Sequence, residues 1–122
     1  MDPEQMKGRT KQFGLRVIRL VEALPTSKTA NVIGRQLLRS GTSVGANYRS
    51  ACRGRSKADF ISKVGIALEE ADESLYWMEL LTEAGIVAKA QLNPLMQEAN
   101  ELVAIFSASI KTARANTRNK LE

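Results

Sequence analysis

The sequence predicts an all-α domain, an up-down-up-down antiparallel four-helix bundle. Apolar residues recur at spacings of three and four along almost the whole chain, and the alternation typical of strands is missing. Only 3 prolines and 8 glycines interrupt the 122 residues, which leaves four helical segments with short links, and short links favour antiparallel neighbours. The length suits one domain. We expect an ordered core over residues 7–114 and a flexible polar tail over residues 115–122.

The first helix is expected from Lys7 to Leu24, because Pro25 cannot continue it. The second helix is expected from Lys28 to Arg53, capped by Thr26 or Ser27. Its inward positions alternate in steps of three and four and form a heptad-like seam. The members of this seam are Ala30, Ile33, Leu37, Ser40, Val44, Asn47 and Ala51.

Three glycines, Gly34, Gly41 and Gly45, lie inside the second helix, where each costs about 1 kcal/mol relative to alanine. We expect them to allow the close approach of a neighbouring backbone. The seam keeps its phase across them, which favours an unbroken helix, and the alternative is a break near Gly41. The seam also contains Ser40 and Asn47, whose polar groups need partners if they are buried.

The third helix is expected from Lys57 to Ala84. Ser56 stands three residues before Asp59, which resembles a capping box, and Gly85 suits the C-terminal cap. Neighbouring positions already supply the inward face, so we expect Trp77 to point outward, where it would suit a subunit interface.

Two interpretations stay open for the start of the fourth helix. Asn93 and Pro94 provide a cap and first position, or Pro94 lies in the first turn of a helix begun near Ala88. The apolar stripe ends at about Arg114. The last two residues, Leu121–Glu122, resemble a cloning remnant.

The formal net charge of +5 is unevenly distributed. Residues 1–55 carry 11 basic and 3 acidic side chains, whereas residues 56–87 carry 2 basic and 7 acidic side chains. Such asymmetry indicates either a nucleic-acid surface or two segments that neutralise one another within the fold, and the two interpretations are compatible.

An arginine row lies on the second helix, within an arc of about 80°. Its members are Arg35, Arg39, Arg49 and Arg53. A turn centred on residues 54–55 places Arg39 level with Glu70 and Gln36 level with Glu73, and it leaves Arg35 within reach of Glu73. We therefore expect Arg35 and Arg39 to be structural. The cations at the turn end face few carboxylates, and a guanidinium fork matches phosphate oxygens. The candidate nucleic-acid-binding residues are Arg49, Arg53, Arg55 and Lys57.

The composition argues against catalysis. The chain has no histidine, so the commonest general base and the commonest zinc ligand are missing, and Cys52 has no such base to activate it. The acidic cluster over residues 69–73 could hold a hard cation, but salt bridges are the preferred interpretation. We expect no catalytic residue, no metal and no cofactor. The chain shows neither a signal peptide nor an apolar run of membrane length, which predicts a cytoplasmic protein with no membrane partner.

Small and polar residues at fixed spacings resemble the signature of a known family. The signature positions are Gln36, Arg39, Ser40, Ser43 and Asn47, continued by Glu70 and Glu73. Over residues 10–112 the chain resembles the small four-helix-bundle proteins encoded in intervening sequences of bacterial large-subunit ribosomal RNA genes. It departs from the common pattern at residues 47–51, where the family often has Asn-Ile-Ala-Glu-Gly, and near residues 71–72, where a Gly-Ser pair is frequent. These departures indicate a variant branch.

The resemblance implies a ring-like homopentamer without enzymatic activity, in a family whose biological role is mostly unknown. A related accessory variability protein of diversity-generating retroelements is a basic pentamer that binds nucleic acid and a reverse transcriptase. The implied partners are therefore further copies of the chain, RNA or DNA, and a reverse transcriptase or another protein. Two functions stay open: a non-enzymatic oligomeric scaffold that binds RNA or DNA through phosphates, or a protein-interaction or structural bundle that binds no nucleic acid.

Overall fold

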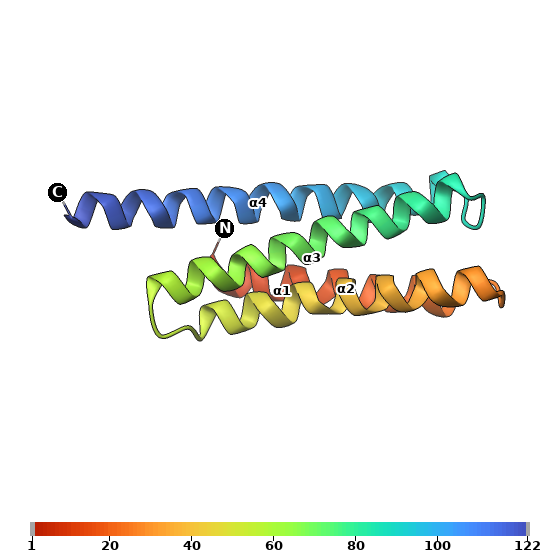
Figure 1. Cartoon of the computed structure of the whole chain (residues 1–122), viewed down its shortest axis with the longest axis horizontal. Coiled ribbons are helices and arrows are strands. Elements are labelled where there is room, and N and C mark those ends of the chain that lie inside the picture. Colours follow the sequence, from red (N-terminus) through yellow and green to blue (C-terminus); the bar gives the residue numbers. More distant parts are fainter. Residues whose placement is uncertain (1, 122) are drawn as a thin grey trace.

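A computed structural model describes residues 2–121, with side chains over residues 2–116. The chain folds into four helices that run alternately up and down (Figure 1). They are α1 (Pro3–Glu22), α2 (Lys28–Cys52), α3 (Lys57–Glu83) and α4 (Lys89–Leu121). The described residues contain no strand. The predicted all-α four-helix bundle is confirmed.

The helix ends differ from the predicted ones by more than two residues at two places, the start of α1 and the end of α4. The first helix begins at Pro3 rather than near Lys7, because Asp2 caps it. The Asp2 carboxylate accepts a hydrogen bond from the Gln5 backbone N–H at 2.9 Å, and the Gln5 side chain accepts one from the Asp2 N–H at 3.4 Å. Pro3 fits the first helical position, where no N–H is needed.

The fourth helix begins at Lys89, close to the start near Ala88 that the second interpretation gave. Pro94, however, lies inside the helix and beyond its first turn. The helix also continues past Arg114 to Leu121, so that it projects beyond the turn that joins α2 to α3 (Figure 1). The prediction that Leu121–Glu122 is a cloning remnant includes Glu122, which lies outside the described residues.

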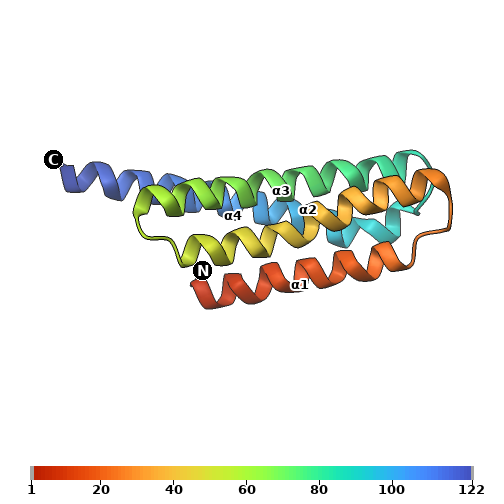
Figure 2. The same ribbon diagram turned by 60° about the horizontal axis from the view of Figure 1, so that its bottom comes forward.

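The helix α2 lies between α1 and α3, and α3 packs in turn against α4. Figure 2 shows α1 and α3 at opposite edges with α2 between them, and these two helices are not in contact. The first and last helices touch only lightly. Arg9 joins them, since its Nε and Nη2 atoms donate to the two carboxylate oxygens of Glu98 at 2.8 and 2.6 Å. This hydrogen bonding raises the pKa of Arg9.

All four helices contribute to one hydrophobic core. Tyr48 of α2 stacks on Phe106 of α4, with ring centroids 5.9 Å apart. The largest side chains that are fully buried are Phe13, Phe106, Leu37, Met78, Leu81, Leu92 and Leu102. The apolar stripes predicted from the 3.6-residue period therefore form the core.

The glycines of α2 allow it to approach α1 closely, as predicted, and the helix runs unbroken through them. A Cβ atom on Gly41 would lie 2.7 Å from both γ-methyl groups of Val17, and one on Gly45 would lie 3.3 Å from the backbone oxygen of Thr10. On the other side of α2, the buried hydroxyls of Ser40 and Ser74 are 2.9 Å apart, and Ser74 donates. The expectation of a buried partner for Ser40 is thus confirmed.

Candidate nucleic-acid interface

The turn between α2 and α3 is short and tightly capped. The Ser56 hydroxyl accepts a hydrogen bond from the Asp59 backbone N–H at 3.0 Å, which begins α3 at the predicted residue. Gly54 has no room for a side chain, because a Cβ there would lie 2.8 Å from Oδ2 of Asp59 and 3.0 Å from the backbone oxygen of Ala51. The turn thus places Arg53, the C-cap residue of α2, close to the first residues of α3.

Three of the predicted cations meet in a surface hollow of about 340 Å³ beside this turn. Arg49, Arg53 and Arg55 line the hollow, are exposed, and form no ion pair with any side chain that the structure describes. Asp59 is the one carboxylate among the lining residues. The hollow therefore keeps a surplus of positive charge that the fold does not neutralise.

Lys63 is a fourth cation of the hollow, and the sequence reasoning missed it. Its ammonium donates to the Ser50 hydroxyl at 3.0 Å, which holds the side chain against α2. The antiparallel register that predicted the position of Arg39 also places Lys63 level with Ala46, a lining residue of the same hollow. The same register that predicts few carboxylates at this end of the third helix therefore also indicates a further cation there.

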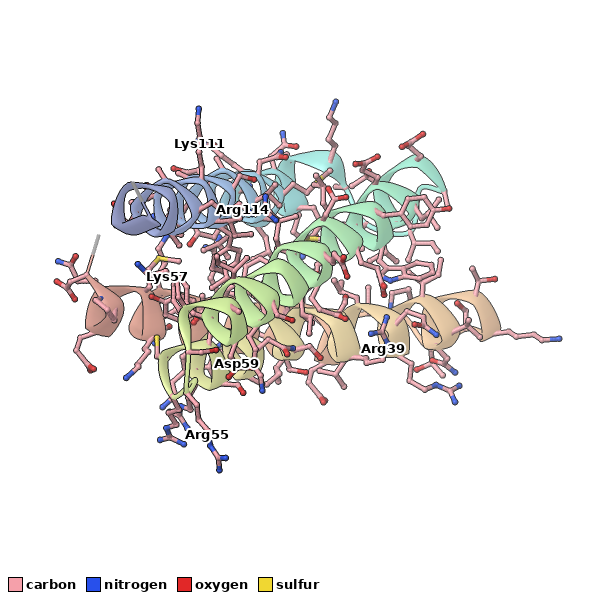
Figure 3. The ribbon with its side chains drawn as sticks, turned by 60° about the vertical axis from the view of Figure 1, so that its left-hand side comes forward. Arg39, Arg55, Lys57, Asp59, Lys111 and Arg114 are labelled. Carbon is pink, nitrogen blue, oxygen red and sulfur yellow. The ribbon has the colours of Figure 1, made fainter. Side chains whose placement is uncertain are left out.

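Lys57 does not join the other predicted cations. It borders a separate cleft of about 840 Å³ between the first turn of α3 and α4, with Tyr48 and Phe60 among the lining residues. Figure 3 shows Arg55 pointing away from the bundle and Lys57 on the side of α3 that is nearer to α4. Within this cleft, burial raises the pKa of Tyr48, and a hydrogen bond with Cys52 adds to the shift.

Arg39 lies farther along α2 and is paired, as predicted. Its Nη1 donates to Oε2 of Glu70 at 3.2 Å, its Nη2 donates to Oε2 of Glu73, and its Nε donates to Oε1 of Gln36 at 3.3 Å. Figure 3 shows Arg39 beneath α3, well away from Arg55. The pairing predicted for Arg35 is wrong. Arg35 lines a hollow with Val21, Leu24 and Pro25 and makes no ion pair within the described part of the chain.

The signature residues form a connected polar strip where α2 faces α3. Ser43 donates to the backbone oxygen of Arg39 at 2.7 Å, and Asn47 donates to that of Ser43 at 2.9 Å. The buried hydroxyls of Ser40 and Ser74 join this strip to α3. All these hydrogen bonds have both partners within the fold, and the structural role of these residues stays a prediction.

The outward position predicted for Trp77 is wrong. Trp77 is half-buried against the core, and its Nε1 donates to Oε2 of Glu73 at 2.9 Å, so it belongs to the Arg39 cluster. Its neighbour Tyr76 is the outward residue, with 53% of its surface exposed.

Among the described residues, no three His, Cys, Asp or Glu side chains lie close enough together to hold a metal ion. Cys52 is a free, half-buried thiol. None of the described helices has the length and apolar character needed to cross a membrane.

The fold and the site together define a small four-helix-bundle protein with an unneutralised basic corner at its middle turn. The chain belongs to the 23S rRNA-intervening sequence protein family, whose profile matches residues 5–108. A solved structure from Bacteroides thetaiotaomicron, described as a protein with unknown function from the S23 ribosomal protein family, is similar with a TM-score of 0.85. The two chains are 36% identical over 91% of this chain and 99% of that chain. No match was found among curated proteins. The family resemblance inferred from the residues is confirmed.

Proposed function

We propose that this protein is a non-enzymatic, oligomeric scaffold that binds RNA or DNA through backbone phosphates at the corner between α2 and α3. One observation carries the proposal: four cations and one carboxylate line the hollow there, and its three arginines have no ion-pair partner among the described side chains. Arginine presents a planar fork of donors that matches phosphate oxygens, and most protein–nucleic acid hydrogen bonds go to the backbone.

The composition of the hollow favours phosphate contacts over base recognition. Its described lining residues include no aromatic side chain on which a base could stack. Phosphate contacts carry no sequence information by themselves. The proposed binding is therefore tolerant of sequence and strongly dependent on salt, because each neutralised phosphate releases condensed counterions.

Assembly strengthens this interaction. The resemblance to pentameric relatives supports a ring-like homopentamer, in which copies of formal charge +5 each would present several basic corners to one polyanion. A reverse transcriptase or another protein is proposed as a further partner on the resemblance alone. We also propose a cytoplasmic location, where nucleic acid is accessible.

Filter binding of labelled mixed-sequence RNA and DNA, each at a low and a high salt concentration, tests the proposal. We expect retention at low salt that falls steeply as salt rises. Absence of retention of both nucleic acids at low salt would refute the proposal and leave the protein-interaction bundle as the remaining function. Retention with a shallow salt dependence would show that phosphate contacts are not its cause. The RNA and DNA arms identify the preferred nucleic acid.

Replacement of Arg49, Arg53 and Arg55 together by glutamine assigns the binding to the corner. The slope of log affinity against log salt should become shallower by about three, one for each phosphate contact removed, while the thermal unfolding midpoint stays unchanged. The matched control K28Q/R35Q/K89Q removes the same charge from exposed positions near the opposite end of the bundle and should bind like the wild type. Equal losses in both variants would mean that net charge alone drives the binding.

A further inference from the structure

Two outward faces of the bundle expose large apolar side chains. Leu15 and Ile18 on α1 are 37% and 38% exposed, and Ile66 and Tyr76 on α3 are 40% and 53% exposed. Since isolated surface apolar residues are common, the pairs carry meaning only through their surroundings. Those surroundings differ in charge between the two helices.

The α1 face borders a groove of about 380 Å³ that runs between α1 and α2. Gly14 and Gly45 line it beside Leu15 and Ile18, at the place where the backbones of α1 and α2 approach closely. The charged residues along the groove are all basic, namely Lys7, Lys11 and Arg49. Lys11 and Arg49 have no ion-pair partner within the described residues, and Lys7 pairs only with the exposed Glu4, at 3.1 Å.

The α3 face has the opposite charge. Ile66, Glu69, Asp72 and Tyr76 follow one another at spacings of three, three and four and are all exposed, which places them on one side of the helix. Glu69 and Asp72 make no ion pair with any described residue. The neighbouring acids Glu70 and Glu73 instead form ion pairs with Arg39. Glu69 and Asp72 therefore take no part in the ion pairs between α2 and α3.

We propose that the α3 face of one copy of this chain docks into the α1–α2 groove of the next copy. The lengths agree, since Lys7 to Ile18 and Ile66 to Tyr76 each span about 15 Å of helix. The order of the groups agrees as well when the two helices run in the same direction. Tyr76 then lies level with Leu15 and Ile18, where it can cover them. Asp72 comes level with Lys11 and Glu69 with Lys7, while Ile66 lies beyond Lys7. The occupant is a second copy because the chain itself carries an acidic helix face with two exposed apolar residues.

This contact is heterologous, since the two patches differ and lie on two helices that α2 separates (Figure 2). Every copy therefore offers one groove and one acidic face, and repetition gives a closed ring or an open filament. The inference deepens the assembly proposed above and rests on it. Arg49 lines both the groove and the phosphate hollow, so each hollow would lie beside a subunit boundary, and a bound strand could pass from one copy to the next.

Charge reversal tests the contact, with the mass in solution measured by light scattering at fixed ionic strength. The variants K7E/K11E and E69K/D72K should each lose the oligomer and fall to the single-chain mass, because each places like charges across the contact. An equimolar mixture of the two variants should regain the oligomer, and so should a chain that carries all four substitutions. Circular dichroism checks that every variant remains helical, and K89E/K111E is the control with the same charge change elsewhere.

The outcomes separate this contact from the assembly itself. A wild-type protein of single-chain mass at all concentrations refutes both. An oligomeric wild type whose two reversal variants keep their mass refutes the contact and leaves the assembly standing. Variants that dissociate but do not recover in the mixture also refute the contact, because complementary faces must restore one another. Dissociation followed by recovery supports it.

Discussion

The two ends of the arginine row on α2 have different environments, although they share one helix and one residue type. Arg39 meets Glu70 and Glu73 of α3, and its guanidinium is occupied by the fold. Arg49 and Arg53 share their hollow with Asp59 and Lys63 of α3, and neither arginine forms an ion pair with any described side chain. The comparison shows that the neighbouring helix, more than the arginine itself, decides whether a cation stabilises the fold or remains available to a ligand.

The largest expected effect comes from giving Arg49 and Arg53 a carboxylate partner on α3, as Arg39 already has. Lys63→Glu places a carboxylate beside Arg49 and Arg53, so their guanidinium groups become occupied, as that of Arg39 is. Nucleic-acid affinity at low salt should fall at least about tenfold, because one cation is lost and two are neutralised. Filter binding measures the fall, and Lys63→Gln, which only removes a charge, should give a smaller one. Unchanged affinity in the glutamate variant would break the comparison.

A second prediction separates stability from binding. Gly41→Ala forces a methyl group against Val17, which is fully buried, and should lower the free energy of unfolding by about 1–3 kcal/mol in a denaturant titration. Gly65→Ala is the matched control. It has no atom within 4 Å of its new Cβ and should instead stabilise α3 by up to about 1 kcal/mol. Below the unfolding transition neither variant should change nucleic-acid affinity, and a loss of affinity in the folded Gly41 variant would contradict the separation.

The third prediction concerns the paired end. Glu73→Gln weakens a partly exposed pair and should cost about 1 kcal/mol or less in the free energy of unfolding. It should also change the emission of Trp77, the one tryptophan of the chain, since its Nε1 donates to Glu73. Glu83→Gln, at an exposed carboxylate with no described ion pair, should change neither quantity. Equal effects of the two substitutions would show that the Arg39 cluster adds nothing to the fold.

The smallest effect is expected at the buried hydroxyl pair. Ser40→Ala or Ser74→Ala alone should destabilise the protein by less than about 1 kcal/mol, because the remaining hydroxyl still has a backbone acceptor in its own helix. The double variant should cost less than the sum of the two, which a double-mutant cycle in chemical denaturation measures. Strict additivity would indicate that the 2.9 Å contact between the hydroxyls contributes nothing.

Local sequence patterns predicted the four helices and the pairing of Arg39, but they did not predict the environment of every arginine. The 3.6-residue period located the helices, and one antiparallel register paired Arg39 with Glu70. The same register failed for Arg35, because the register gives the level along a helix but not the direction around it. Arg35 turns toward the end of α1, where Pro25 and Leu24 lie, rather than toward α3.

Other features depend on contacts between distant segments, which a local pattern cannot predict. Arg9 and Glu98 come from the first and last helices, so their bond follows only from the closure of the bundle. The cleft that separates Lys57 from the other cations is created by α4, which passes the first turn of α3. The early start of α1 is different, since the residues Asp2 and Gln5 of its capping box are readable in the sequence.

The most direct test of the comparison is the salt dependence of nucleic-acid binding in two single variants, Arg53→Gln and Arg39→Gln. Both remove one charge, Arg39→Gln within α2 and Arg53→Gln at its C-cap. If the free end binds phosphates and the paired end does not, the slope of log affinity against log salt becomes shallower by about one for Arg53→Gln and stays at the wild-type value for Arg39→Gln. Equal slopes in the two variants, or a change confined to Arg39→Gln, would contradict the account.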